Sequence, residues 1–240
     1  MIIKCEDMDF KELNHKIRHS RDKKIVIENC IGQRYIGDGV SDKELVVHGI
    51  PGNGLGAYLD GGKIRVYGNG QDAIGDTMND GEIVIHGSCG DAPGYAMRGG
   101  RIFIKENAGY RTGIHMKAYK ENIPVIIIGG NVGSFLGEYQ AGGHIVVLGM
   151  ENKGAPPVGF FCGTGMHGGK IFLRCDFLPF DLPKQVIANE AGPGDLAEID
   201  RHLSDFCREF DFDKGEILSK KFYVLTPNTK NPYKQLYVHS

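Results

Sequence analysis

The sequence of 240 residues contains no tryptophan and no apolar run of the length that a membrane-spanning helix needs, about 18 residues. Its first six residues also lack the basic segment and the long apolar core of a signal peptide. Lysine and arginine together number 28 against 30 aspartates and glutamates, a net charge of −2 that gives no general attraction to nucleic acid or to an acidic membrane. We therefore expect a cytoplasmic protein that binds neither.

Paired cysteines are missing as well. The chain has six cysteines, but none of them forms a CxxC pair. Spacing of this kind predicts reduced, mostly buried thiols, and it argues against a zinc knuckle or an iron–sulfur cluster in this chain. The six cysteines are Cys5, Cys30, Cys89, Cys162, Cys175 and Cys207. Cys89 and Cys162 are flanked by glycine without an evident activating base, so we expect them to be packing or turn residues.

Catalytic patterns are also absent. There is no P-loop sequence, and no Ser-His-Asp or Cys-His arrangement can be assembled. His48 and His86 occupy one strand column, but Tyr67 lies between them, which favours a stacked surface over a zinc site. Local Asx turns account for three aspartates in glycine-rich loops, namely Asp72, Asp76 and Asp91. We predict no catalytic, cofactor-binding or metal-binding residues.

Glycine, by contrast, is abundant, at 36 of 240 residues. Many of these glycines follow one frame, G-x-x-G-x-x-x-G, which is complete at three places and partial between them. An internal repeat of about 20 residues indicates a repeat architecture, and a frame used many times is scaffold geometry rather than one ligand site. The glycines that define this structural motif are Gly49, Gly52, Gly56, Gly68, Gly75, Gly87, Gly90, Gly94, Gly109, Gly113, Gly130, Gly133 and Gly137.

Each repeat also carries a short run of alternating β-branched residues, which is typical of a strand. A unit of about 19 residues has room for two or three short strands and tight turns, but none for a helix. We therefore predict an all-β solenoid. It would be a right-handed, single-stranded parallel β-helix of about seven to eight coils, with a 19–20-residue repeat and short N- and C-terminal helices. Long side chains at one position of successive repeats should fill its core, namely Leu59, Met78, Met97, Met116 and Met166.

Three segments are expected along the chain: a helical cap over residues 1–23, the β-helix over 24–178, and a C-terminal helix and tail over 179–240 that pack on it. Asp9 with Glu12, and Asp195 with Glu198, have the spacing of a capping box and predict the starts of the two helices. The second helix has an apolar stripe at helical spacing, made of Leu196, Ile199, Leu203, Phe206 and Phe210.

The strands are apolar on both faces, which predicts that both faces are covered. We expect an outward column of Val26, Val46, Arg65, Val84, Phe103, Ile126, Val146 and Phe172. The C-terminal helix, a partner protein, or both on different parts of the sheet should cover this column. The candidate interface residues are Ile126, Ile128, Val146 and Leu148.

The glycine frame on its 19–20-residue repeat resembles the β-helical C-terminal GXGXG domain of the large (alpha) chain of glutamate synthase. Gly49–Gly56, Gly87–Gly94 and Gly130–Gly137 carry the resemblance, which covers roughly residues 24–175. The closing segment, Lys221–Pro227, is similar too. The same frame also occurs in one of the polypeptides of formylmethanofuran dehydrogenase and in related stand-alone proteins.

The resemblance implies a non-catalytic structural subunit of a multi-subunit oxidoreductase of nitrogen metabolism. In glutamate synthase this domain aligns the glutaminase and the flavin/iron–sulfur domains. The chain shows no flavin-binding barrel and no clustered cysteines, so the resemblance implies a separately encoded subunit with FMN and iron–sulfur clusters held by its partners. Three alternatives stay open: a component of formylmethanofuran dehydrogenase, a self-assembling homo-oligomer, and a stand-alone β-helical enzyme that acts on carbohydrate or transfers acyl groups.

Overall fold

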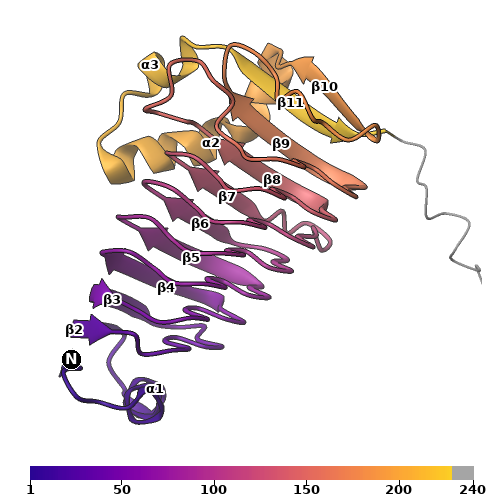
Figure 1. Cartoon of the computed structure of the whole chain (residues 1–240). Helices are drawn as coiled ribbons and strands as arrows, with labels where there is room; N and C mark the ends of the chain where they lie inside the picture. The colour runs from indigo at the N-terminus through magenta and orange to yellow at the C-terminus, as the bar shows by residue number, and fades with distance from the viewer. Residues whose placement is uncertain (229–240) are drawn as a thin grey trace, which may run out of the picture.

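The computed structural model describes residues 1–228, and its main feature is one long sheet (Figure 1). The strand order is β1-β2-β3-β4-β5-β6-β7-β8-β9-β11-β10, parallel from β1 to β9 and antiparallel at the β10 end. The parallel strands are β1 (Ile2–Lys4), β2 (Lys24–Ile31), β3 (Glu44–Ile50), β4 (Asp60–Tyr67), β5 (Asp80–Ile85), β6 (Arg101–Ile104), β7 (Val125–Ile128), β8 (Ala141–Val147) and β9 (Gly168–Arg174). The remaining elements are β10 (Val186–Glu190), β11 (Phe222–Pro227), α1 (Phe10–His19), α2 (Pro193–Phe210) and α3 (Lys214–Leu218).

The predicted β-helical solenoid is wrong. The strands form a single open sheet of eleven strands within residues 1–228, and the connections between them contribute only isolated bridges, such as Ala108 with Val132. The backbone of the connections explains the difference. Gly54, Gly56 and Tyr58 have φ values of +73°, +65° and +56° at every second position, whereas a parallel strand needs φ near about −120°. These segments therefore form turns instead of further strands.

The turns of successive repeats are hydrogen-bonded to one another. The Gly54 N–H donates to the Asp72 carbonyl of the next repeat at 2.9 Å, and the Gly56 N–H donates to the Ile36 carbonyl of the previous repeat at 2.8 Å. Together they form a layer over one face of the sheet, with an apolar core in between. Leu59, Met78, Met97, Met116 and Met166 lie in that core and are at most 2% exposed, which confirms their predicted role.

The predicted strand register holds up to β6 and fails at β7. Ile102 pairs with Ile126 rather than with Val125. Ile126 and Ile128 consequently face the inner core, while Val125 and Ile127 face outward. The reason lies in the sequence, because all four residues of β7 are apolar and give no alternation from which to assign a face.

The two longer helices start close to the predicted positions. The Asp9 carboxylate accepts a hydrogen bond from the Lys11 N–H at 2.8 Å and caps α1, as predicted, and Leu13 and Ile17 of this helix are buried. Helix α2 begins at Pro193, so Asp195 is not its N-cap. The N-cap is Gly192, and the Asp195 carboxylate accepts a hydrogen bond from the Gly192 N–H at 3.1 Å.

Helix α2 runs across the outer face of the sheet (Figure 1). Four residues of its predicted stripe are buried there, namely Ile199, Leu203, Phe206 and Phe210, and Leu196 packs against them partly buried. They meet outward residues of the strands, among them Val84, Phe103, Val146 and Phe172. The chain therefore covers part of this face, from β5 to β9, with its own helix.

The expected C-terminal segment ends at residue 240, and its residues 229–240 lie outside the described part of the chain. Within residues 1–228, no helix is both long enough and apolar enough to cross a membrane.

Candidate functional site

The glycine frame lies where the chain approaches itself most closely. A Cβ atom on any of the frame glycines would lie under 3.0 Å from an atom elsewhere in the chain. On Gly49 the obstacle would be the backbone of Cys30, and on Gly68 the carbonyl oxygen of Gly49. The third glycine of each frame, such as Gly94 (φ +70°), also has a positive φ and lies against a core isoleucine side chain, here Ile126. The structure thus places the frame inside the scaffold.

A ladder of side-chain oxygens links the turns of neighbouring repeats. Asp72 Oδ1 accepts a hydrogen bond from the Asp91 N–H at 2.9 Å, and Asp91 Oδ1 accepts from the Tyr110 N–H at 2.8 Å. The local Asx turns predicted for these two aspartates are therefore wrong, because their partners lie 19 residues further along. Asp76 does interact locally, accepting from the Thr77 hydroxyl at 2.8 Å.

A parallel ladder of asparagine and serine side chains leads to a cleft. Asn69 Oδ1 accepts from the Ser88 N–H at 2.9 Å, and Asn107 Oδ1 accepts from the Asn131 N–H at 2.7 Å. The cleft has a volume of about 490 Å³ and opens beyond the ends of β6 and β7. Its lining consists of Lys105, Glu106, Asn107, Gly129, Gly130, Asn131, Met150, Glu151 and Phe212.

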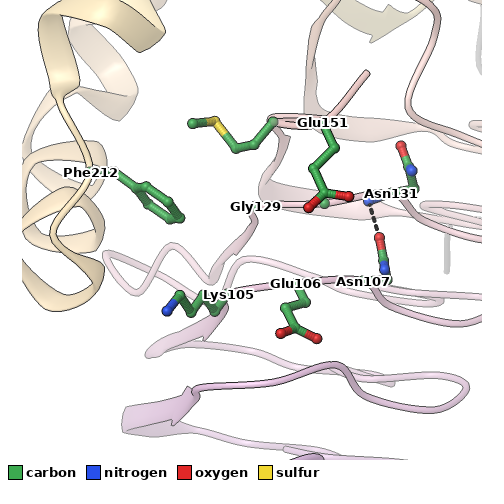
Figure 2. A pocket seen from close by; sticks show the side chains of 9 residues that line it. Lys105, Glu106, Asn107, Gly129, Asn131, Glu151 and Phe212 are labelled. Atoms are coloured by element: carbon green, nitrogen blue, oxygen red, sulfur yellow. Dashed lines mark hydrogen bonds between the residues drawn. The ribbon is translucent and has the colours of Figure 1, made fainter. Parts of the chain in front are cut away.

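The cleft has the chemistry of a polar pocket with one apolar wall. Figure 2 shows Phe212 reaching from the helix side toward the turns that carry Glu106 and Glu151. The Glu106 carboxylate accepts a hydrogen bond from the Ser88 hydroxyl at 2.9 Å, so it supports the turn next to it. The described lining contains no histidine, cysteine or serine; its ionisable side chains are Lys105, Glu106 and Glu151. The cleft has the size and the polar lining to hold a small polar molecule.

The underside of α2 is held to the sheet by ion pairs as well as by apolar packing. Arg65 forms a bidentate pair with Glu209, with both N···O distances at 2.8 Å. Arg101 forms an ion pair with Asp205, with 2.6 Å between a guanidinium nitrogen and a carboxylate oxygen. Lys170 forms another with Glu198, with 2.6 Å between Nζ and Oε1. The hydrogen bond from Arg65 holds the pKa of the Glu209 carboxyl below its usual value, and the bond to Glu198 raises the pKa of Lys170. The helix therefore has a fixed position along the sheet.

Three histidines lie at this junction with lowered pKa values. Burial is the main cause for His86, His144 and His202. The Lys170 charge lowers the pKa of His144 further, while the nearby Glu198 carboxylate raises it. The pKa of His202 is lowered further by the charges of Arg101, His144 and Arg201, and the Asp205 carboxylate opposes this change. The Nδ1 atoms of His144 and His202 are buried without a hydrogen-bond partner. The fold thus favours neutral imidazoles at this junction.

We expect the protein to lose stability as the pH falls from about 7.5 to 5.5. An unfolded histidine binds a proton near pH 6.5, while these histidines bind it only at lower pH in the folded state. The unfolded state therefore gains more protons as the pH falls, and the free energy of unfolding decreases. Urea unfolding followed by circular dichroism at several pH values measures the effect. Replacing His202 with glutamine should flatten the pH dependence, and an unchanged urea midpoint in the native chain would contradict the prediction.

All six cysteines are buried and unpaired, and burial raises the pKa of each thiol. For Cys30, Cys89 and Cys162 the pKa is raised to about 12, and for Cys175 to about 11. This agrees with the predicted packing role of Cys89 and Cys162. No group of three or more His, Cys, Asp or Glu side chains within residues 1–228 is placed to hold a metal ion.

The native thiols should therefore resist modification. Because thiolate is the reactive form, we expect a thiol-specific disulfide reagent at pH 8 to label the folded protein only slowly. All six cysteines should react once urea unfolds the chain. Rapid labelling of a single native cysteine, located by mass spectrometry, would instead reveal an accessible, activated thiol.

The four candidate interface residues are all buried within the chain. Ile126 and Ile128 lie in the inner core, and Val146 and Leu148 lie in the core beneath α2, each at 0% exposure. His48, Tyr67 and His86 form the expected stack, with ring centroids 5.1 and 4.5 Å apart. The sequence did not single out the exposed aromatic side chains at the other end of the sheet, including Phe160, Phe161 and Phe180.

Comparison with known proteins places this architecture in a family. The model of the GXGXG motif family matches residues 6–229. The chain belongs to the GXGXG motif family. This confirms the resemblance to the C-terminal GXGXG domain of glutamate synthase that the glycine frame indicates. The frame glycines of this GXGXG-motif protein are the residues that bring neighbouring repeats into contact.

A relative of this GXGXG-motif protein is the uncharacterized protein MJ1350 of Methanocaldococcus jannaschii. The two are 44% identical over an alignment of 250 residues, which covers 99% of this chain and 96% of the relative. The similarity is thus spread over both proteins and is not confined to the glycine frame.

Proposed function

We propose that this chain is a non-catalytic subunit of a glutamate-synthase-type oxidoreductase, in which it aligns a glutaminase with a flavin/iron–sulfur protein. The family match over residues 6–229 carries the proposal, because it makes nearly the whole chain the equivalent of one domain of that enzyme type. In this proposal the partners hold FMN and the iron–sulfur clusters.

The construction of the chain suits a spacer. Nine parallel strands at the usual spacing of about 4.8 Å span roughly 40 Å. Turns bonded to the next repeat cover one face of this sheet, and α2 covers part of the other. Because both layers are tied across many strands, the two ends of the sheet are held at a fixed distance, as alignment of two partners requires.

Affinity purification from the native source tests the proposal. A tagged chain should recover a glutaminase and a flavin-containing protein, and the recovered complex should show flavin absorbance. The isolated chain should have no glutaminase or glutamate-forming activity, whereas adding it to the separated partners should restore glutamine-dependent glutamate formation. Recovery of the chain alone, or with a pterin-cofactor protein of the formylmethanofuran dehydrogenase type, would overturn the proposal.

A further inference from the structure

Strand β10 forms one edge of the sheet and leaves one side of its backbone unpaired by the described strands (Figure 1). Its other side pairs with β11 in antiparallel register, Ala188 lying opposite Leu225. An exposed edge strand offers a row of N–H and C=O groups to another strand. The opposite edge, β1, is only three residues long, so β10 with five residues is the longer edge.

The hydrogen bonds that flank β10 identify the groups on its free side. The Asn228 N–H donates to the Gln185 carbonyl, and the Ala191 N–H donates to the Phe222 carbonyl. In an antiparallel pair, hydrogen-bonded residues alternate with residues whose N–H and C=O point the other way. The odd-numbered residues of β10 therefore face β11, and Val186, Ala188 and Glu190 present their backbone groups to the free edge.

The free groups are complementary to those of a second β10. The Val186 N–H already donates to the Pro183 carbonyl at 2.9 Å, which leaves the Ala188 and Glu190 N–H groups as donors. An antiparallel pairing centred on Ala188 directs each Ala188 N–H to the Ala188 carbonyl of the second copy. The same pairing directs each Glu190 N–H to a Val186 carbonyl. This pairing matches every free donor with an acceptor and leaves the Glu190 carbonyl of each copy without a donor, because the Val186 N–H is already bonded within its own chain.

The side chains favour the same register. Glu190 would stand opposite Val186 of the second copy, so like charges do not meet, and Glu190 is already 3.4 Å from its partner Lys221. Ile187, which is 42% exposed, would lie diagonal to its own equivalent on the same face of the joined sheet. The segment that leads into β10 also carries Phe180 at 90% exposure. Phe180 lies against the exposed Phe160, with ring centroids 6.0 Å apart, and contiguous exposed apolar side chains are typical of contact surfaces.

We propose that a second copy of this chain binds at β10, and that the two sheets join through an antiparallel β10–β10 pair about a two-fold axis at Ala188. The dimer is a closed, isologous assembly because the same strand serves both copies. It leaves the other end of each sheet, at β1 and α1, free for different partners. The inference rests on the free edge of β10 and does not depend on the proposed function.

Light scattering coupled to size-exclusion chromatography tests the proposal on the full chain. The measured mass should be twice the 26.3 kDa of one chain. Ile187→Lys places two like charges on diagonal positions and should raise the dissociation constant of the dimer by about tenfold or more. Ile50→Lys is the matched control, since Ile50 is 44% exposed at the end of β3 and should leave the dimer intact.

A backbone variant and hydrogen exchange make the test specific to the strand. Ala188→Pro removes a donor that faces away from β11, so circular dichroism should remain native while the mass falls to that of one chain. The Ala188 and Glu190 amides of the native protein should exchange more slowly as the protein concentration rises. A monomer at all concentrations, a dimer unaffected by Ile187→Lys, or dimerisation that requires a different protein would each overturn the proposal.

Discussion

Replacing Phe206 with alanine should lower the free energy of unfolding by about 3–5 kcal/mol. The Phe206 ring is fully buried beneath α2, where it meets Phe103 of β6 edge to face with ring centroids 5.6 Å apart. It also contacts Phe210 and Phe212, at 4.9 and 5.9 Å between ring centroids. Alanine would leave a cavity in the centre of the contact between helix and sheet. Urea unfolding monitored by circular dichroism gives the change in free energy.

A control on the same helix separates packing from helix propensity. The Arg208 side chain is 76% exposed, and among residues 1–228 its one ion pair is with Asp205, three residues before it. Arg208→Ala should therefore change the free energy of unfolding by no more than about 0.5 kcal/mol. A loss of less than about 1 kcal/mol for Phe206→Ala would show that α2 is not packed on the sheet as described.

The sequence predicted α2 well because its apolar stripe alternates with polar residues at helical spacing. Strand β7 lacks such a contrast. Val125, Ile126, Ile127 and Ile128 are equally apolar, and the longer connection before them removes the counting argument that works for the earlier strands. A shift of one residue exchanges the two faces of a strand. For that reason the sequence placed Ile126 and Ile128 on the outer face of the sheet, whereas their side chains lie in the inner core.

The predicted solenoid failed for a related reason. Left-handed backbone in the turns is not confined to glycines: Tyr58, Ala73 and Ala92 have φ values of +56°, +56° and +54°. Non-glycine residues seldom adopt this conformation, so no residue type marks it in the sequence. Cross-repeat bonds between the turns hold these residues in place, as the Ala73 N–H donating to the Asp91 carbonyl at 2.8 Å illustrates.

The candidate site was predictable in one part and not in another. Asn53, Asp72 and Asp91 recur every 19 residues, and this spacing is a signal for the side-chain ladder once the strands are in register. The ion pairs under α2 have no such signal. Arg65 and Glu209 are 144 residues apart, so only the packed structure brings them together.

Replacing Gly49 with alanine should lower the free energy of unfolding by about 2–5 kcal/mol, the sum of an overpacking term and a backbone term. Gly49 pairs with Cys30 between β3 and β2, and an added Cβ would lie under 3.0 Å from the Cys30 carbonyl oxygen and nitrogen. Because that obstacle is backbone held in the sheet, relief requires a shift of the strands, and forced overpacking costs about 1–3 kcal/mol. The positive φ of Gly49, +125°, adds strain of about 1–2 kcal/mol for any other residue. Urea unfolding of the variant measures the sum.

The matched control is Gly32, which has a φ of +77° and no atom within 4 Å of the position that a Cβ would take. Gly32→Ala should lower the free energy of unfolding only by the backbone strain that it introduces, about 1–2 kcal/mol. The difference between the two variants therefore measures the close approach of neighbouring repeats, separately from the left-handed backbone. If Gly49→Ala cost no more than Gly32→Ala, conformational freedom alone would account for the frame. A larger loss at Gly49 would show that the glycine frame is required by the spacing between strands, and so by the architecture that the whole chain repeats.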